Sequence, residues 1–241
     1  MSERLRQRIA NFNAVVESIE ILLSPARDST LQNNAMQEII SRLDEVSSWK
    51  REAVKEGNED EANSYLGMEC VGKSLEAELD MWLLLKADKP EQAWDRLIDA
   101  QQAARNATRA HPGFEHLAET TSRLEAIEKL IFPPQVFMSA GLLVEERRCS
   151  ICGVDYDDCE HLVGQPYMGE LCHRKITKFH IDHVSIVTDP ANKRCRVTHF
   201  SVEGGNRNRM TWRVEPAISK GDSEQGLECQ GRIISVGDLD C

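Results

Sequence analysis

The first part of the chain carries apolar residues at alternating spacings of four and three positions. Residues 3–23 show this pattern most clearly, with apolar side chains at Leu5, Ile9, Phe12, Val16, Ile19 and Leu23. Such spacing places all of these side chains on one face of an α-helix. The pattern therefore predicts an amphipathic helix over residues 3–23, which Ser24 and Pro25 bring to an end.

Four further amphipathic helices are predicted before residue 132, each bounded by a start or stop signal. Ser29 and Gln32 form a capping box for the second helix, and Pro90 falls in the first turn of the fourth. Because the connections are short, neighbouring helices are expected to pack antiparallel in a bundle. The four helices cover about residues 30–55, 58–86, 88–111 and 117–131.

After residue 134 the pattern changes to short apolar runs separated by turn residues, which is typical of β-strands. The fold class is therefore predicted to be α+β, with an antiparallel helical bundle over residues 1–132. A small antiparallel β domain is predicted over residues 133–241. Its strands cover about residues 135–144, 171–188, 194–202, 210–214 and 231–236.

Composition and charge limit the classes of protein that fit this pattern. The 241 residues are 41% hydrophobic and 29% charged, and no apolar run is long enough for a transmembrane helix. The charged N-terminal segment lacks the apolar region of a secretory signal, so we expect a cytoplasmic protein with no membrane partner.

Charge is distributed unevenly along the chain. The formal net charge is -11, with -8 over residues 1–132 and +6 over residues 174–213. The basic stretch suggests a nucleic-acid contact, while its alternatives are docking against the acidic helices or a solvated face without a partner. A protein partner or self-association is expected at the bundle. The residues considered for nucleic acid are Arg174, Lys175, Lys178, Arg194, Arg196, Arg207 and Arg209.

A cluster of cysteines gives the strongest chemical signal in the sequence. Cys149 and Cys152 are two residues apart along the chain, and Cys159 is followed by His161. Zn²⁺ prefers four Cys and His ligands in a closed tetrahedral site, so these four residues are the predicted ligands and the β domain is expected to be zinc-stapled. Cys172 is the alternative to His161 as the fourth ligand. The other interpretation of the cluster is a set of free or disulfide-bonded cysteines.

One helical segment resembles a ribonuclease signature. Arg105, Asn106 and His111 are similar to the Arg-Asn…His motif of the HEPN ribonucleases. In that family the Arg stabilises phosphate charge and the His moves protons, so the resemblance implies an RNase that uses Arg105 and His111. The alternative is an ordinary solvated helix end, where Arg109 and His111 interact favourably with the helix dipole.

Two later segments resemble the prohead (head-maturation) serine proteases of tailed phages. Residues 137–141 are similar to the nucleophile strand of that family, and residues 183–192 to a later strand and turn. Some members carry a Cys-x-x-Cys…Cys-x-His insert between these strands. The resemblance covers about residues 135–200 and implies a serine protease with Ser139 as its nucleophile.

The chain departs from that family where Ser139 would be activated. His183 stands where the family has an acidic residue, and the region that supplies the family's catalytic His is predicted to be helical here. A Ser hydroxyl needs an adjacent base, and the spacing assigns that role to neither His180 nor His183.

The sequence therefore favours a zinc-binding, non-catalytic interaction protein over an enzyme. The phage-type resemblance implies a bacterial, phage or mobile-element system, with antiphage defence among the settings. The alternative functions are a serine protease using Ser139 and an RNase using Arg105 and His111.

Overall fold

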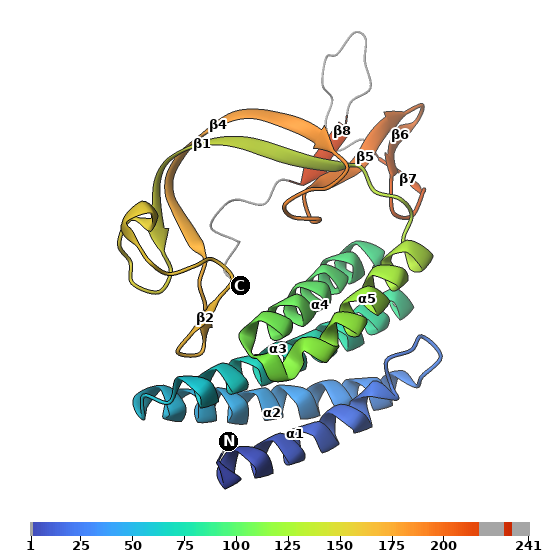
Figure 1. The fold of residues 1–241 in the computed structure, drawn as a ribbon. Coiled ribbons are helices and arrows are strands. Elements are labelled where there is room, and N and C mark those ends of the chain that lie inside the picture. Colours follow the sequence, from blue (N-terminus) through green and yellow to red (C-terminus); the bar gives the residue numbers. More distant parts are fainter. Residues whose placement is uncertain (1, 217–228, 233–241) are drawn as a thin grey trace. The chain divides into compact units, whose positions relative to one another are not determined.

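The computed structural model describes residues 2–216 and, by their backbone only, residues 229–232. It confirms the predicted α+β class, because five α-helices precede an antiparallel sheet within these residues (Figure 1). The predicted helices are all present. They are α1 (Glu3–Glu20), α2 (Ser29–Lys55), α3 (Glu59–Lys86), α4 (Pro90–Ala110) and α5 (Ala118–Ile131), with the 3-10 helix η1 (Pro112–Leu117) before α5.

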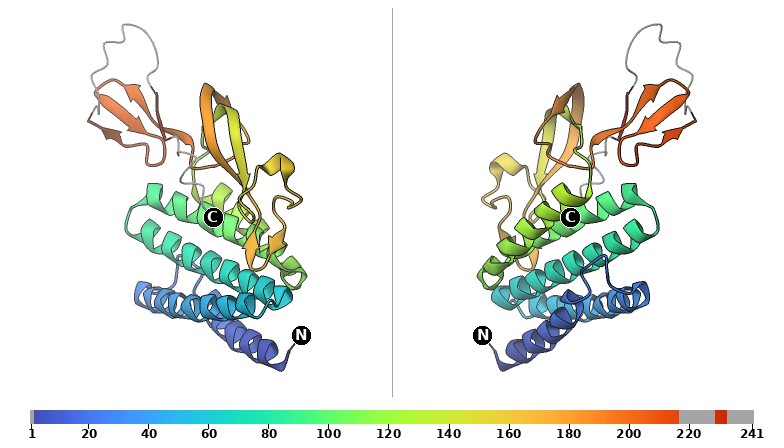
Figure 2. Two further views of the ribbon diagram at one scale, coloured as in Figure 1. Left: turned by 90° about the vertical axis from the view of Figure 1, so that its left-hand side faces the viewer. Right: turned by 90° about the vertical axis from the view of Figure 1, so that its right-hand side faces the viewer.

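Helix α3 lies at the centre of the helical bundle and packs against both α2 and α4 (Figure 2). Its side chains are buried around most of its circumference, including Tyr65 and Leu79. Two glycines permit this close packing. A Cβ atom at Gly67 would lie 2.3 Å from the Phe114 ring, and one at Gly72 would lie 2.7 Å from the Leu43 side chain. A larger residue at either position would force the Phe114 ring or the Leu43 side chain to move.

The cap of α2 differs from the prediction. Asp28, not Ser29, is the N-cap residue, and its carboxylate accepts hydrogen bonds from the backbone N–H groups of Thr30 and Leu31. The Gln32 side chain is fully buried and donates to the carbonyl oxygens of Leu22 and Ser24. Gln32 therefore closes the α1–α2 connection instead of completing a capping box.

The strands that the structure describes form one larger sheet and one small hairpin. The sheet order is β4-β1-β5-β6-β7, with β8 also paired to β5, and β2 pairs with β3 in the hairpin. The strands are β1 (Phe137–Cys149), β2 (Pro166–Tyr167), β3 (Glu170–Leu171), β4 (Arg174–Val187), β5 (Arg196–Val202), β6 (Gly205–Asn208), β7 (Val214–Glu215) and β8 (Cys229–Arg232).

One predicted strand is replaced by a turn, and another lies mostly outside the described residues. Residues 209–211 form a turn and residues 212–213 are irregular, because the Asn208 side chain accepts hydrogen bonds from the N–H groups of Met210 and Thr211. The strand predicted over residues 231–236 lies mostly outside the described residues, and only its first two positions belong to β8.

The compact units of the structure are not consecutive along the chain. The helical unit comprises Met1–Glu128 together with Arg148–Lys175, and the sheet unit comprises Lys129–Arg147 together with Ile176–Cys241. The cysteine segment, residues 148–175, thus belongs with the helices. This division differs from a single boundary at residue 132, since the cysteine segment was expected within the β domain.

Candidate metal centre

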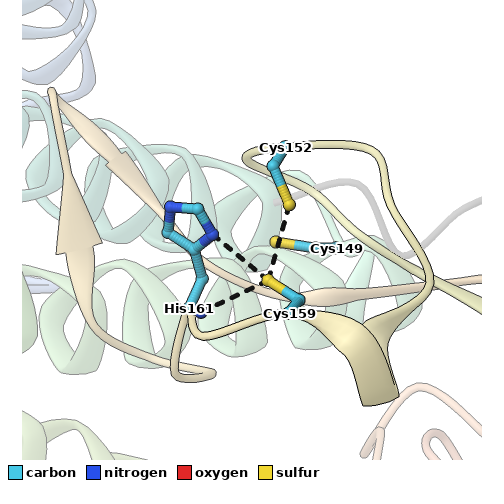
Figure 3. A group of neighbouring side chains, drawn as sticks. All are labelled: Cys149, Cys152, Cys159 and His161. Atoms are coloured by element: carbon cyan, nitrogen blue, oxygen red, sulfur yellow. Dashed lines mark hydrogen bonds between the residues drawn. The ribbon is translucent and has the colours of Figure 1, made fainter.

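Four side chains of the cysteine segment converge on one point. The Sγ atoms of Cys149, Cys152 and Cys159 and a ring nitrogen of His161 all lie within 4.8 Å of one another. Figure 3 shows the three sulfur atoms and the imidazole turned toward each other. Cys149 is buried, Cys152 is exposed, and the other two are half-buried. These are the four predicted ligands, and they lie close enough to bind a metal ion.

The first pair of ligands lies on a tight turn at the end of β1. The N–H of Gly153 donates to the carbonyl of Cys149 at 2.9 Å, and Gly153 has φ +73°, which a residue with a side chain rarely adopts. The N–H of Ile151 points at the Cys149 sulfur, 3.4 Å away. This turn brings Cys152 back over Cys149 and directs a backbone dipole at the sulfur.

The second pair follows the 3-10 helix η2 (Tyr156–Asp158), which returns the chain to the first pair. The Cys159 sulfur lies 3.4 Å from that of Cys152 and 3.2 Å from Nδ1 of His161. The N–H of His161 also donates to the Cys159 sulfur at 3.2 Å. The spacing of one residue thus places a thiol and an imidazole on the same side of the loop.

Cys172 is a close neighbour of this group. Its sulfur lies 3.8 Å from that of Cys149, and both side chains are buried. Two sulfur ligands of a tetrahedral zinc ion are separated by about 3.8 Å, given a Zn–S bond of about 2.3 Å. Cys149, Cys152, Cys159 and Cys172 are thiols and not disulfides.

The environment stabilises the thiolate form of Cys149. Burial alone raises the pKa of this thiol, but N–H groups of Cys152 and Ile151 and the thiols of Cys159 and Cys152 lower it to about 6. Burial and the neighbouring sulfur atoms raise the pKa of Cys159 to about 11 and that of Cys172 to about 11. Cys149 therefore favours the thiolate form at neutral pH, whereas binding of a cation to Cys159 must release a proton.

Several supporting residues were not identified from the sequence. The Tyr167 hydroxyl accepts a hydrogen bond from the N–H of Leu162, and its ring meets the His161 ring edge to face at 4.6 Å between centroids. The Tyr156 hydroxyl accepts from the N–H of Val163, and the Arg174 guanidinium lies 4.4 Å from the centre of the Tyr156 ring. The sequence signal that could have identified them is the pair of aromatic residues Tyr156 and Tyr167, which lie on either side of His161. They hold the loop that carries His161.

The hairpin β2–β3 attaches the cysteine segment to the helices. Its turn residues Met168 and Gly169 have φ of 47° and 81°, as a tight hairpin turn requires. The N–H of Gly169 donates to the buried Asn63 side chain at 2.8 Å, and that of Met168 to Glu59 at 3.2 Å. Leu171 packs against the helical core. The cluster and α3 are thus parts of one compact unit.

The residues of the ribonuclease-like motif already have structural partners. Arg105 forms an ion pair with Glu125 at 3.0 Å. Nδ1 of His111 accepts the N–H of Gly113, and its Nε2 lies 3.2 Å from Asp60. Because Nδ1 accepts, the ring proton lies on Nε2 and points at the carboxylate. His111 therefore caps η1, whose N-terminus is at Pro112.

Ser139 lies on β1 and is half-buried. On β4, the His183 ring packs over Gly141 and its Nδ1 lies 2.9 Å from Asp182, while His180 pairs with Glu145 at 2.7 Å. Within the described residues, no hydrogen bond joins the Ser139 hydroxyl to either histidine.

The basic residues are divided between the two units. Arg174 and Lys175 belong to the helical unit, whereas the other five belong to the sheet unit. Arg196 is 3% exposed and donates to Gln135, so it does not lie on a solvent face. Lys178 pairs with Glu145, and Arg207 lies against the Trp212 ring.

Comparison of the chain with protein-family models, curated proteins and solved structures gives no match. Among the helices of the described residues, none combines the length and apolar character needed to cross a membrane.

Proposed function

We propose that Cys149, Cys152, Cys159 and His161 hold one structural Zn²⁺ ion. The observation that carries this proposal is the convergence of three thiols and an imidazole nitrogen within 4.8 Å, one of the thiols with a pKa lowered to about 6. Three sulfur atoms and one nitrogen are the ligand set that favours tetrahedral zinc over Mg²⁺ or Ca²⁺, which prefer oxygen. Nδ1 of His161 faces Cys159 and is the assigned donor.

A site with four protein ligands has no open position for substrate, so the ion would be structural and not catalytic. Its task would be to hold residues 149–161 as a closed loop, with Cys172 packed beside it. Cys172 is the alternative fourth ligand, because its sulfur already lies at a tetrahedral edge distance from Cys149.

We further propose that the whole chain is a non-catalytic interaction protein of a bacterial, phage or mobile-element system, with antiphage defence among its settings. The resemblance over residues 135–200 supports the setting. The incomplete surroundings of Ser139, and the capping role of His111, support a binding role over a serine protease or an RNase.

Metal analysis of the purified chain tests the zinc proposal. We expect one zinc per chain in the wild type and in Cys195→Ser, whose cysteine is outside the cluster, and none in Cys149→Ser/Cys152→Ser. X-ray absorption at the zinc edge then distinguishes three sulfur atoms and one nitrogen from four sulfur atoms, and so His161 from Cys172. Full zinc occupancy in the double variant would show that the ligands are elsewhere.

A further inference from the structure

Strand β4 lies at an edge of the sheet among the strands that the structure describes. It is 14 residues long, contains no proline and is bonded to β1 on one side only (Figure 1). An edge strand presents a row of backbone N–H and carbonyl groups that another strand can pair with. Proteins usually protect such edges by shortening them, by a proline or by charged side chains. β4 is long and has no proline, and its protection is limited to charges such as Lys178 and Asp182.

The β1–β4 ribbon exposes aliphatic side chains on both of its faces. On β4, Ile181 is 63% exposed, Val184 49% and Ile186 76%. On β1, Leu143 is 60% exposed and Val144 41%. Successive side chains of a strand point to opposite faces, so Ile181 lies on one face and Val184 and Ile186 on the other. A partner packed on one face would leave the other uncovered, whereas a strand added at the edge lies beside both.

We propose that β4 pairs edge to edge with β4 of a second copy of this chain. The two strands run antiparallel about a two-fold axis at His180 and give a symmetric dimer. This register places the exposed side chains of Lys178 and Asp182 opposite each other, twice per dimer. It also places Phe179 opposite Ile181, and Ile176 opposite Val184.

Neighbouring registers fit less well, which is why a second copy is the occupant. An axis at Ile181 would set Lys178 opposite Val184, and an axis at Phe179 would set Lys178 opposite His180 and Ile176 opposite Asp182. Moving the axis by one residue shifts the pairing by two positions, which removes the Lys178–Asp182 pairs and the Ile176–Val184 pairs together. Of these three registers, only the one about His180 sets the opposite charges of Lys178 and Asp182 against each other, as expected for a strand that pairs with itself.

Two charge-reversal variants test the register. In Lys178→Glu and in Asp182→Lys, like charges face each other across the two-fold axis, so each variant alone should dimerise at least about tenfold more weakly than the wild type. In an equal mixture of the two variants, the new Glu of one chain faces the new Lys of the other. The remaining Asp182 of the first chain faces the remaining Lys178 of the second, so a heterodimer should form. Lys178→Glu also places a second carboxylate beside Glu145 of the same chain, but this contact is present in the monomer and in the dimer alike.

The experiment is sedimentation velocity of full-length protein over a concentration series, with native mass spectrometry of the mixture. Glu203→Lys, an exposed acid in the β5–β6 turn, is the matched control and should dimerise as the wild type does. Zinc content and circular dichroism are measured for every variant, so that a loss of metal or of fold is recognised separately. A wild type that stays monomeric would overturn the proposal. So would a dimer that neither variant weakens, or a mixture in which heterodimers are no more frequent than homodimers.

Discussion

Loss of the metal is expected to destabilise the helices as well as the loop that carries the ligands. The reason is that the cysteine segment belongs to the helical unit and contacts α3 through the β2–β3 hairpin. The perturbation is Cys152→Ser, which removes one ligand at an exposed position and creates no cavity in the helical core.

The size of the effect follows from the contacts that the hairpin makes. If the hairpin leaves α3, the buried Asn63 side chain loses the Gly169 N–H donor, which costs about 1–3 kcal/mol. Leu171 also leaves the helical core, and partial exposure of a leucine costs about 1 kcal/mol. Together these losses give about 3 kcal/mol. For a protein of this size each kcal/mol corresponds to about 2–4 °C, so the helical transition should fall by roughly 6–12 °C.

The assay is thermal unfolding followed by the helical circular dichroism signal, with zinc content determined for each sample. Cys195→Ser serves as the control, because it removes a cysteine outside the cluster, and it should melt as the wild type does. Addition of a chelator to the wild type should reproduce the shift of Cys152→Ser. If the helices melt at the same temperature with and without bound zinc, the hairpin does not couple the metal to the helical unit and the reasoning is wrong.

Three further predictions can be tested in the same preparations. Zinc affinity should increase as the pH rises from 7 to 8, by about tenfold for each proton released, because Cys159 with its pKa of about 11 must lose a proton to bind; calorimetry in buffers of different ionisation enthalpy counts the protons. Gly169→Ala should destabilise the protein by about 1–2 kcal/mol in urea unfolding, since φ is +81° and the new Cβ would lie 3.0 Å from Lys50; an unchanged midpoint would contradict the proposed turn strain. Co-expression with a candidate substrate should yield no cleavage that Ser139→Ala abolishes, and a single such cleavage product would restore the protease alternative.

Local sequence patterns determined the helices and the cluster of candidate ligands. The predicted apolar stripe includes Leu5, Phe12 and Ile19, and all three are buried on α1. Val15 is buried in place of the predicted Val16. The two-residue spacing of Cys149 and Cys152 acts within a single turn, so the pairing of these ligands depends little on the rest of the fold. A helix and a turn such as the one between Cys149 and Gly153 are stabilised by contacts between residues close in sequence. Periodicity and spacing were therefore sufficient to predict them.

Only the tertiary structure decided which unit the cysteine segment joins and which polar side chains are buried. Asn63 lies on a predicted helix with no sign in its neighbours that it receives the Gly169 N–H from more than one hundred positions away. Arg196 alternates like a surface strand residue but is 3% exposed, and Cys172 reaches Cys149 across 23 positions of chain. Such contacts depend on how distant segments pack, and a pattern of neighbouring residues carries no information about packing at that separation.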